Sequence, residues 1–195
     1  MMKAKTFQEK WALLTKYENK PALTKKNIKS ICVLANDKDA LVRTEAYDSL
    51  SAFPSKHAQK ILKQAIVHEP NALARSYAIL SWADVTQALG VHKKQKKFLK
   101  QLKKLPKIKK SEHCMLSFYY AKYVLGHKKS LKKLLAFLNS SDYQICCCAV
   151  NLLWDIVSPE NRQSIKQALE HLLQQEVCAS VSENAAELLQ YIKTA

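Results

Sequence analysis

The sequence is poor in the residues that make turns, and it has no long apolar run. Only 2 glycines and 5 prolines occur among 195 residues. So few turn residues exclude a β-sandwich of many short strands, and an apolar fraction of 48% excludes a disordered chain. The most apolar stretch, residues 145–157, contains Asn151 and Asp155 and is too short to span a bilayer. We therefore expect an all-α fold without a membrane span.

The sequence also lacks the motifs of common catalytic and metal sites. No GxSxG, HExxH, P-loop or GxGxxG string occurs, and no CxxC pair or Cys/His cluster has zinc-finger spacing. Three of the 6 cysteines are consecutive, at 146–148, and Cys32, Cys114 and Cys178 occupy apolar positions of other expected helices. We expect packed free thiols, no cofactor and no metal. The first eleven residues contain no apolar run like that of a signal peptide, so the expected location is the cytoplasm.

An internal repeat is the strongest positive signal. An aliphatic residue or Ala is followed four residues later by Ala and four after that by a large apolar residue, which keeps all three on one helical face. The line occurs four times, with a degenerate copy at Ser117, Ala121 and Leu125. We expect its members to be buried: Val42, Ala46, Leu50, Ala78, Trp82, Ile145, Ala149, Leu153, Ala185 and Leu189.

The repeat predicts stacked helix pairs in a single domain, residues 1–195. After a capping helix at 6–17, the expected pairs are 25–36 with 40–53, 56–68 with 72–89, 93–105 with 112–125, 130–139 with 143–157, and 159–175 with 178–193.

Several residues mark the helix ends. Asn71 and Ser111 are expected N-caps, and Ser158 followed by Pro159 is expected to begin a helix. Gly90 and Gly126 each follow the second helix of a pair, where a left-handed residue ends a helix.

The segment 37–46, DKDALVRTEA, followed by Leu50, resembles a HEAT repeat: an acidic turn, a Val-Arg pair, an Ala and a Leu. Residues 71–82 match the same pattern with Arg75 in the Arg position, and the later copies keep only the apolar line. The resemblance implies a HEAT-like, armadillo-like α-solenoid of about five helix pairs, coiled as a right-handed superhelix with the second helices lining the concave face.

Acidic residues are nearly absent from one part of the chain. Residues 93–133 contain 15 lysines and one acid, Glu112, so they carry most of the formal charge of +16. On the helix expected at 93–105, lysines recur at i, i+3, i+4 and i+7. The expected polyanion-binding residues are Lys93, Lys96, Lys97, Lys100, Lys103, Lys104, Lys107, Lys128, Lys129, Lys132 and Lys133.

Two interpretations of these lysines stand side by side. Phosphates of a polyanion would relieve the repulsion between like charges, whatever the base sequence. Alternatively, the lysines form a solvated face without a ligand, because lysine outnumbers arginine 29 to 3 throughout the chain. An anionic membrane surface is disfavoured, since the apolar side of this helix is needed by the core.

Aromatic residues follow the lysines, at Phe118, Tyr119, Tyr120 and Tyr123. Four aromatics within six helical positions point in several directions, so two or three are expected to pack in the core and the remainder is free to stack on bases. The expected contacts on the concave face are Arg43, Arg75, Tyr119 and Lys122.

These observations favour a non-catalytic binding module with an unidentified protein partner and a surface that binds nucleic acid or another polyanion non-specifically. The alternative is an enzyme similar to the HEAT-like alkylpurine DNA glycosylases, which are basic bacterial solenoids that use Trp, Asp and Arg on the concave face. The matching residue types here are Trp82, Asp84, Trp154, Asp155, Arg43 and Arg75, although no family-specific string connects them.

Overall fold

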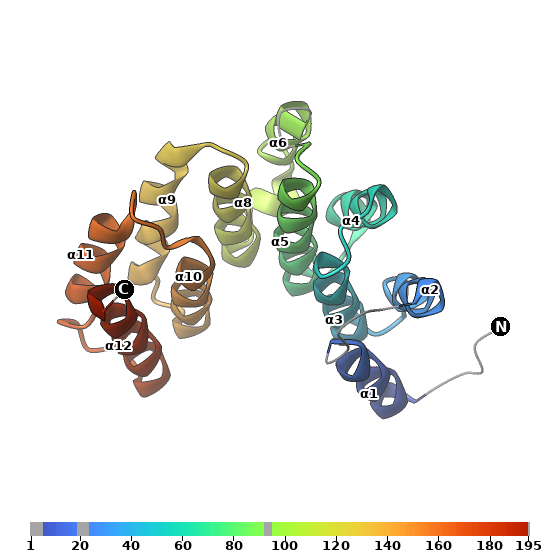
Figure 1. Cartoon of the computed structure of the whole chain (residues 1–195), viewed down its shortest axis with the longest axis horizontal. Coiled ribbons are helices and arrows are strands. Elements are labelled where there is room, and N and C mark those ends of the chain that lie inside the picture. The colour runs from blue at the N-terminus through green and yellow to red at the C-terminus, as the bar shows by residue number, and fades with distance from the viewer. Residues whose placement is uncertain (1–5, 19–23, 92–94, 195) are drawn as a thin grey trace. The chain divides into compact units, whose positions relative to one another are not determined.

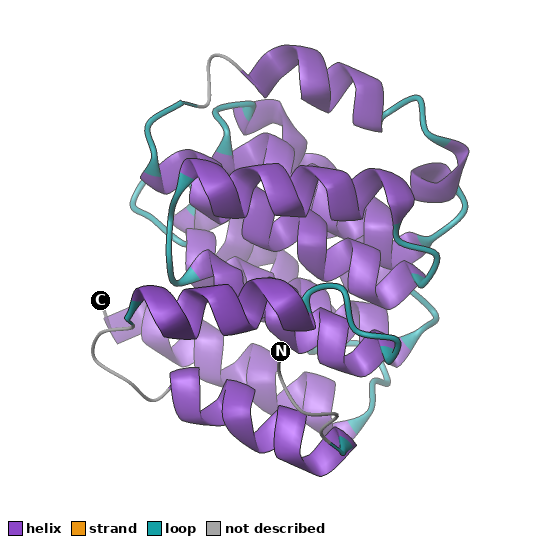
Figure 2. Ribbon diagram, turned by 90° about the vertical axis from the view of Figure 1, so that its right-hand side faces the viewer, coloured by secondary structure: helices purple, strands orange, loops and turns teal. Residues whose placement is uncertain are grey.

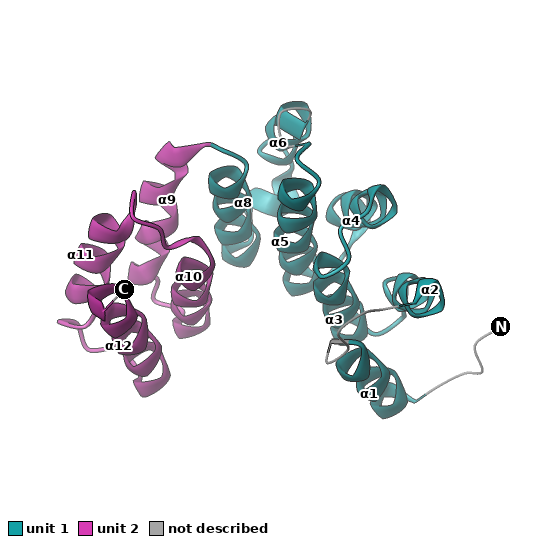
Figure 3. Ribbon diagram, in the orientation of Figure 1, with its two compact units in different colours: residues 1–126 teal, residues 127–195 magenta. Residues whose placement is uncertain are grey.

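In the computed structural model, residues 6–18, 24–91 and 95–194 are described, and within these ranges every regular element is a helix (Figure 2). The expected all-α class is confirmed for this part of the chain. The residues cluster in two compact units, Met1–Gly126 and His127–Ala195 (Figure 3).

The first unit contains eight helices among its described residues. They are α1 (Phe7–Glu18), α2 (Lys25–Leu34), α3 (Ala40–Ser51), α4 (Lys56–His68), α5 (Ala72–Ala88), α6 (Lys96–Leu102), α7 (Pro106–Lys109) and α8 (Glu112–Val124). The prediction for 56–68 is confirmed at both ends, and α1, α2, α3, α5 and α8 end within two residues of their expected limits.

These helices form two rows. Helices α1, α3, α5 and α8 pack side by side in chain order, while α2 packs on α3 and α4 packs on α5 (Figure 1). Helix α6 follows in the second row (Figure 1). Its Phe98 ring meets the Trp82 ring of α5 edge-on, with the ring centres 4.9 Å apart. The small residues Ala46, Ala78 and Ala121 of the first row are fully buried. Because a methyl group occupies little space, they allow these closely packed helices to approach one another.

The second unit has the same local plan over fewer elements. Its helices are η2 (Lys128–Ser130), α9 (Leu131–Leu135), η3 (Ala136–Asn139), α10 (Tyr143–Ile156), α11 (Arg162–Leu172) and α12 (Ala179–Thr194). Helix α10 packs on α12 and on η3, and α11 packs on α12 and on η3. The packing of α10 on α12, with α11 between them in the chain, therefore corresponds to the packing of α3 on α5 in the first unit.

The predicted apolar line is buried throughout. Every residue of the ten is at most 7% exposed, and the largest value belongs to Leu189. The degenerate copy is buried as well, including Ser117. The spacing of four therefore identified the core face of α3, α5, α8, α10 and α12 correctly.

The expected helix ends are confirmed at four positions. The side chains of Asn71 and Ser111 accept hydrogen bonds from the backbone N–H groups of Ala74 and Cys114, which caps α5 and α8. Gly90 and Gly126 have φ angles of +64° and +96°, a conformation that an L side chain adopts only with strain.

The helix expected at 93–105 is wrong in its extent. Helix α6 ends at Leu102, and Pro106 begins a separate four-residue helix, α7. Leu105 is extended (φ −69°, ψ 122°) because the proline ring disfavours a helical conformation in the residue before it. Lys93 lies outside the described residues.

Two expectations in the second unit are also wrong. The helix expected at 130–139 is divided into η2, α9 and η3, and α11 begins at Arg162 rather than at Pro159. The side chain of Asn161 explains the late start, because its oxygen accepts the Ser158 N–H and its amide donates to the Ile156 carbonyl. These bonds fold residues 158–161 as a turn.

A buried charged network connects three elements of the first unit. The Glu69 carboxylate, at the end of α4, accepts hydrogen bonds from the Arg43 Nε and Nη2 atoms at 2.7 and 2.6 Å. It also accepts the Tyr47 hydroxyl at 3.0 Å and the Asn71 N–H at 2.9 Å. Burial alone would raise the pKa of Glu69, but the hydrogen bonds from Arg43, Asn71 and Tyr47 outweigh it, so the net direction is downward.

Replacing Glu69 with alanine should therefore lower the free energy of unfolding by about 3–5 kcal/mol, because the Arg43 guanidinium loses its buried partner. The loss is measured by urea unfolding. Since the folded-state pKa of Glu69 lies below its ordinary value of 4.5, this contribution is complete above that value and declines as the pH falls through the lower, folded-state pKa. The difference between the parent and Glu69→Ala should shrink in acid. A difference that stays constant down to strongly acidic pH would contradict the assignment, and Glu176→Ala, an exposed site, is the control.

Candidate polyanion-binding surface

Eight exposed lysines lie on α6, on α7, on the turn between them and at the residue that follows α7, and we call this group the α6–α7 lysine surface. Its members are Lys96, Lys97, Lys100, Lys103, Lys104, Lys107, Lys109 and Lys110. On the opposite side of the same segment, Leu99, Leu102 and Ile108 are buried in the first unit. The sequence therefore places apolar side chains inward and ammonium groups outward although the helix is broken at Leu105.

Among the described residues, no acidic side chain forms an ion pair with this surface. Residues 96–110 contain no Asp or Glu. Within the described ranges, the ion pairs join Lys10 to Asp37, Arg43 to Glu69, Lys128 to Glu160 and Lys166 to Glu170, and none includes a lysine of the surface. The exposed ammonium groups of this segment therefore carry a net positive charge.

A ninth cation lies beside the surface and was missed by the sequence analysis. Lys63 of α4 places its Nζ atom 4.8 Å from the centre of the Phe98 ring on α6. Partial burial lowers the pKa of Lys63. Phe98 thus packs between Trp82 and Lys63 and links the second-row helices α4 and α6. Lys63 and Phe98 are 35 positions apart, so no local pattern signals their contact.

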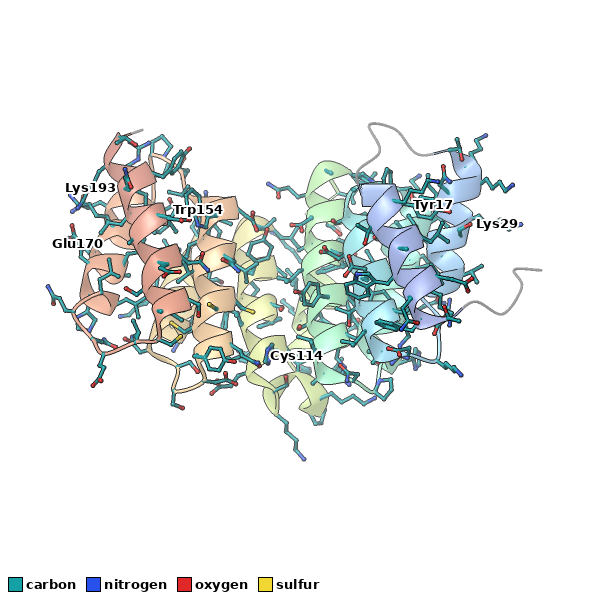
Figure 4. The ribbon with its side chains drawn as sticks, turned by 90° about the horizontal axis from the view of Figure 1, so that it is seen from below. Tyr17, Lys29, Cys114, Trp154, Glu170 and Lys193 are labelled. Carbon is teal, nitrogen blue, oxygen red and sulfur yellow. The ribbon has the colours of Figure 1, made fainter. Side chains whose placement is uncertain are left out.

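Helix α7 is anchored from within the unit by Arg75. Its Nη1 atom donates to the Lys107 carbonyl at 3.3 Å, while Nε donates to the Glu69 carbonyl at 3.1 Å. Nη2 donates to the carbonyls of Glu69 and Pro70. Cys114 lies near the start of α8 (Figure 4). The Arg75 Nη1 atom also donates to its sulfur at 3.9 Å, and the Cys114 thiol donates to the Ala72 carbonyl at 3.3 Å.

These contacts correct the expectation that Arg43 and Arg75 offer their charge to a ligand. Arg75 is only 3% exposed and has its donors directed at backbone carbonyls. The Arg43 guanidinium is held by Glu69 and by the carbonyls of Asp37 and Lys38. In both cases, the Arg of the repeat pattern holds the turn that precedes a first-row helix.

A pocket of about 490 Å³ lies beside Arg43 and Glu69, between α2, α3 and α4. Tyr47, Gln64 and His68 also line it. Its two charged groups neutralise each other, so it offers a ligand no unpaired charge from that pair.

The other lysines of the predicted surface belong to the second unit. Lys128, Lys129, Lys132 and Lys133 are all exposed on η2 and α9. Lys128 forms an ion pair with Glu160 at 3.1 Å, and both side chains are mostly exposed. Solvent-exposed pairs of this kind contribute little to stability.

The aromatic cluster is mostly core. Phe118, Tyr120 and Tyr123 are buried, so the expectation that two or three of the four pack is confirmed. Tyr119 and Lys122 are half-buried. The Lys122 Nζ atom lies 5.7 Å from the Phe118 ring centre and 6.0 Å from the Tyr119 ring centre, so this ammonium group lies beside both rings.

The residue types shared with the glycosylases occupy different environments. Trp82 is fully buried, and Asp84 accepts a hydrogen bond from the Tyr120 hydroxyl at 3.1 Å. Trp154 and Asp155 are exposed on α10, where the Trp154 ring lies 5.3 Å from that of Tyr191 (Figure 4). Burial in the core explains Trp82 without a ligand.

Comparisons with protein-family models, with curated proteins and with solved structures find no match to this chain. In the part of the chain that is described, no helix is both long and apolar enough to cross a bilayer. In that same part, no three His, Cys, Asp or Glu side chains are grouped as a metal site requires.

Repulsion within the lysine surface should be measurable as stability. Lys96 begins α6, and Lys100 lies one turn later on the same side. Lys96→Glu converts this repulsion into an attraction and places an acid at the positive end of the helix, so we expect a gain of about 0.5–1 kcal/mol at low salt. Thermal unfolding followed by circular dichroism measures the gain, which should mostly disappear in about 1 M salt.

The matched control is Lys166→Glu on α11, which makes the same change of charge beside Glu170. This substitution should lower the free energy of unfolding by about 0.3 kcal/mol. Equal effects of the two substitutions would contradict local repulsion as the cause.

Proposed function

We propose that this protein is a HEAT-like helical-repeat binding module that contacts polyanions through the α6–α7 lysine surface. The observation that carries the proposal is the set of eight exposed lysines, none of which forms an ion pair with an acidic residue in the described part of the chain. A protein partner, bound elsewhere on the repeat, belongs to the same proposal, because stacked helix pairs are commonly scaffolds for extended contacts.

The HEAT-like interpretation is supported by how the helices of the first unit pair. Each long first-row helix packs on its first-row neighbours, and α3 and α5 also pack on a second-row helix. The Arg of the repeat string, in Arg43 and Arg75, holds the preceding turn in both copies. An α-solenoid assigns such a repeated role to a repeated residue.

The location of the lysines determines how a polyanion would bind. Helix α6 belongs to the second row with α2 and α4 (Figure 1). In a HEAT-like stack this row is the convex side, so we infer that a nucleic acid lies along the back of the repeat. It would not need to enter the concave face.

The chemistry of the surface favours phosphate over base recognition. Sequence-specific contacts to guanine rely on the planar guanidinium fork of arginine, and this surface contains lysine only. An ammonium group binds phosphate as a point charge, with counterion release as the driving force. We therefore expect non-specific binding to duplex DNA, with affinity that falls steeply as salt rises.

Replacing Lys96, Lys100, Lys103 and Lys104 with Glu should abolish retention on immobilised DNA and on heparin. The circular dichroism spectrum should keep its helical signal, because all four side chains are exposed. In binding titrations, each lysine–phosphate contact contributes about 0.9 to the slope of log affinity against log salt. The parent should show a steep slope, and any binding that the variant retains should show a much smaller one.

The matched control is a second quadruple variant with the same change of net charge. Lys25, Lys26 and Lys29 on α2 and Lys60 on α4 are exposed in the same row as α6, and Lys29 extends from the edge of the first unit (Figure 4). Replacing these four with Glu should leave most of the binding. Equal losses of DNA binding in the two quadruple variants would show that only total charge matters. Unchanged binding in the variant of Lys96, Lys100, Lys103 and Lys104 would show that the α6–α7 lysine surface is a solvated face without a ligand.

The lysines of η2 and α9 require a separate variant. Replacing Lys129, Lys132 and Lys133 with Glu should weaken DNA binding and lower its salt slope without abolishing it. A complete loss would move the main site to the second unit.

A further inference from the structure

Two thiols of the second unit meet at one hydroxyl group. The Cys178 Sγ and Ser180 Oγ atoms are 3.3 Å apart, and the Cys147 thiol of α10 donates to the same oxygen at 3.9 Å. The sum of these two distances limits the separation of the sulfurs to about 7 Å. Both cysteines are free thiols.

Cys178 does not occupy the packed position expected from the sequence. It lies immediately before α12 and is exposed. Its carbonyl accepts the N–H groups of Val181 and Ser182, which places its side chain at the positive end of a 16-residue helix. The Ser180 side chain and the Val181 N–H stabilise the thiolate, so the pKa of Cys178 is lowered. A low pKa together with exposure is characteristic of a reactive cysteine.

The other cysteines of α10 have different surroundings. Cys146 is buried, donates to the Leu138 carbonyl at 3.2 Å, and burial raises its pKa to about 11. Burial also raises the pKa of Cys148, which lies two residues after Cys146 and points to a different side of the helix. Cys147 is half-buried, and its sulfur makes two long polar contacts, with the Ser180 hydroxyl at 3.9 Å and with the Asn184 side chain at 4.0 Å.

We propose that Cys178 is a peroxide-reactive thiol and that Cys147 is its resolving partner. The Cys178 thiol releases its proton to solvent, its thiolate attacks one oxygen of hydrogen peroxide, and the O–O bond breaks. The hydroxide that leaves takes up a proton from solvent, equivalent to the one that Cys178 released, and becomes water. Cys178 is thereby oxidised to a sulfenic acid. The Cys147 thiol then attacks the Cys178 sulfur, an S–S bond forms, and the sulfenic oxygen leaves as water. In total, two thiols lose two electrons and two protons, and one peroxide becomes two waters.

The disulfide requires the two sulfurs to approach by several ångströms, because an S–S bond is about 2 Å long. Residues 173–178, between α11 and α12, contain no α-helical residue. The approach would come from rotation of the exposed Cys178 side chain and adjustment of this non-helical segment, while Cys147 is held by α10. The bond would tie the start of α12 to α10 and so fasten the final helix of the repeat.

The test treats the full-length protein with one equivalent of hydrogen peroxide, then denatures it, alkylates it and determines the intact mass. The parent should lose two alkylatable thiols and two hydrogens. Cys178→Ser should lose neither, and Cys147→Ser should accumulate a sulfenic acid that dimedone traps at Cys178. The control Cys148→Ser should behave like the parent, which distinguishes Cys147 from its neighbour.

A second measurement does not depend on the disulfide. At neutral pH, iodoacetamide should alkylate Cys178 at least about tenfold faster than Cys32, whose thiol burial makes less acidic. Circular dichroism confirms that each variant is folded. A disulfide that still forms in Cys147→Ser, or equal alkylation rates for Cys178 and Cys32, would overturn the proposal.

Discussion

The first unit depends on the turn between α4 and α5, where two guanidinium groups meet the backbone and side chain of Glu69. Arg43 reaches this turn from α3 and also holds the turn before α3 through the carbonyls of Asp37 and Lys38. Arg75 connects it to α7 through the Lys107 carbonyl and contacts the Cys114 thiol of α8. Because buried charges are tolerated only when they are paired and hydrogen-bonded, these contacts fix which elements are neighbours.

The same turn explains why a repulsive surface can persist. Eight ammonium groups on α6 and α7 disfavour the folded segment, and helices of seven and four residues have little stability of their own. The segment is held instead from inside, by Leu99, Leu102 and Ile108, by the contact between Phe98 and Trp82, and by Arg75. The interior thus supplies the stabilisation that the surface lacks.

Much of the fold was predictable because it depends on local periodicity. A spacing of four residues found the buried face of α3, α5, α8, α10 and α12, and the two glycines marked helix ends with positive φ. The end of α6 at Leu102, the short helix α7 and the late start of α11 were missed. The late start depends on the side-chain hydrogen bonds of Asn161, which no local periodicity signals. For the candidate site, composition identified the exposed lysines. It could not reveal that Arg43 and Arg75 are internal or that Lys63 covers Phe98, because these contacts join residues distant in the chain.

Arginine and lysine occupy different places in this protein, and this difference has a chemical consequence. The three arginines, Arg43, Arg75 and Arg162, are all buried or half-buried, whereas the α6–α7 surface is built only from lysine. An amine loses its charge when it is acylated, but a guanidinium does not react in this way under the same mild conditions. The positive surface can therefore be erased one residue at a time by acetylation, while the cations that hold the α4–α5 turn remain charged. The charge of the surface can thus change while the contacts that hold the fold are kept, because the surface uses amines and the α4–α5 turn uses guanidinium groups.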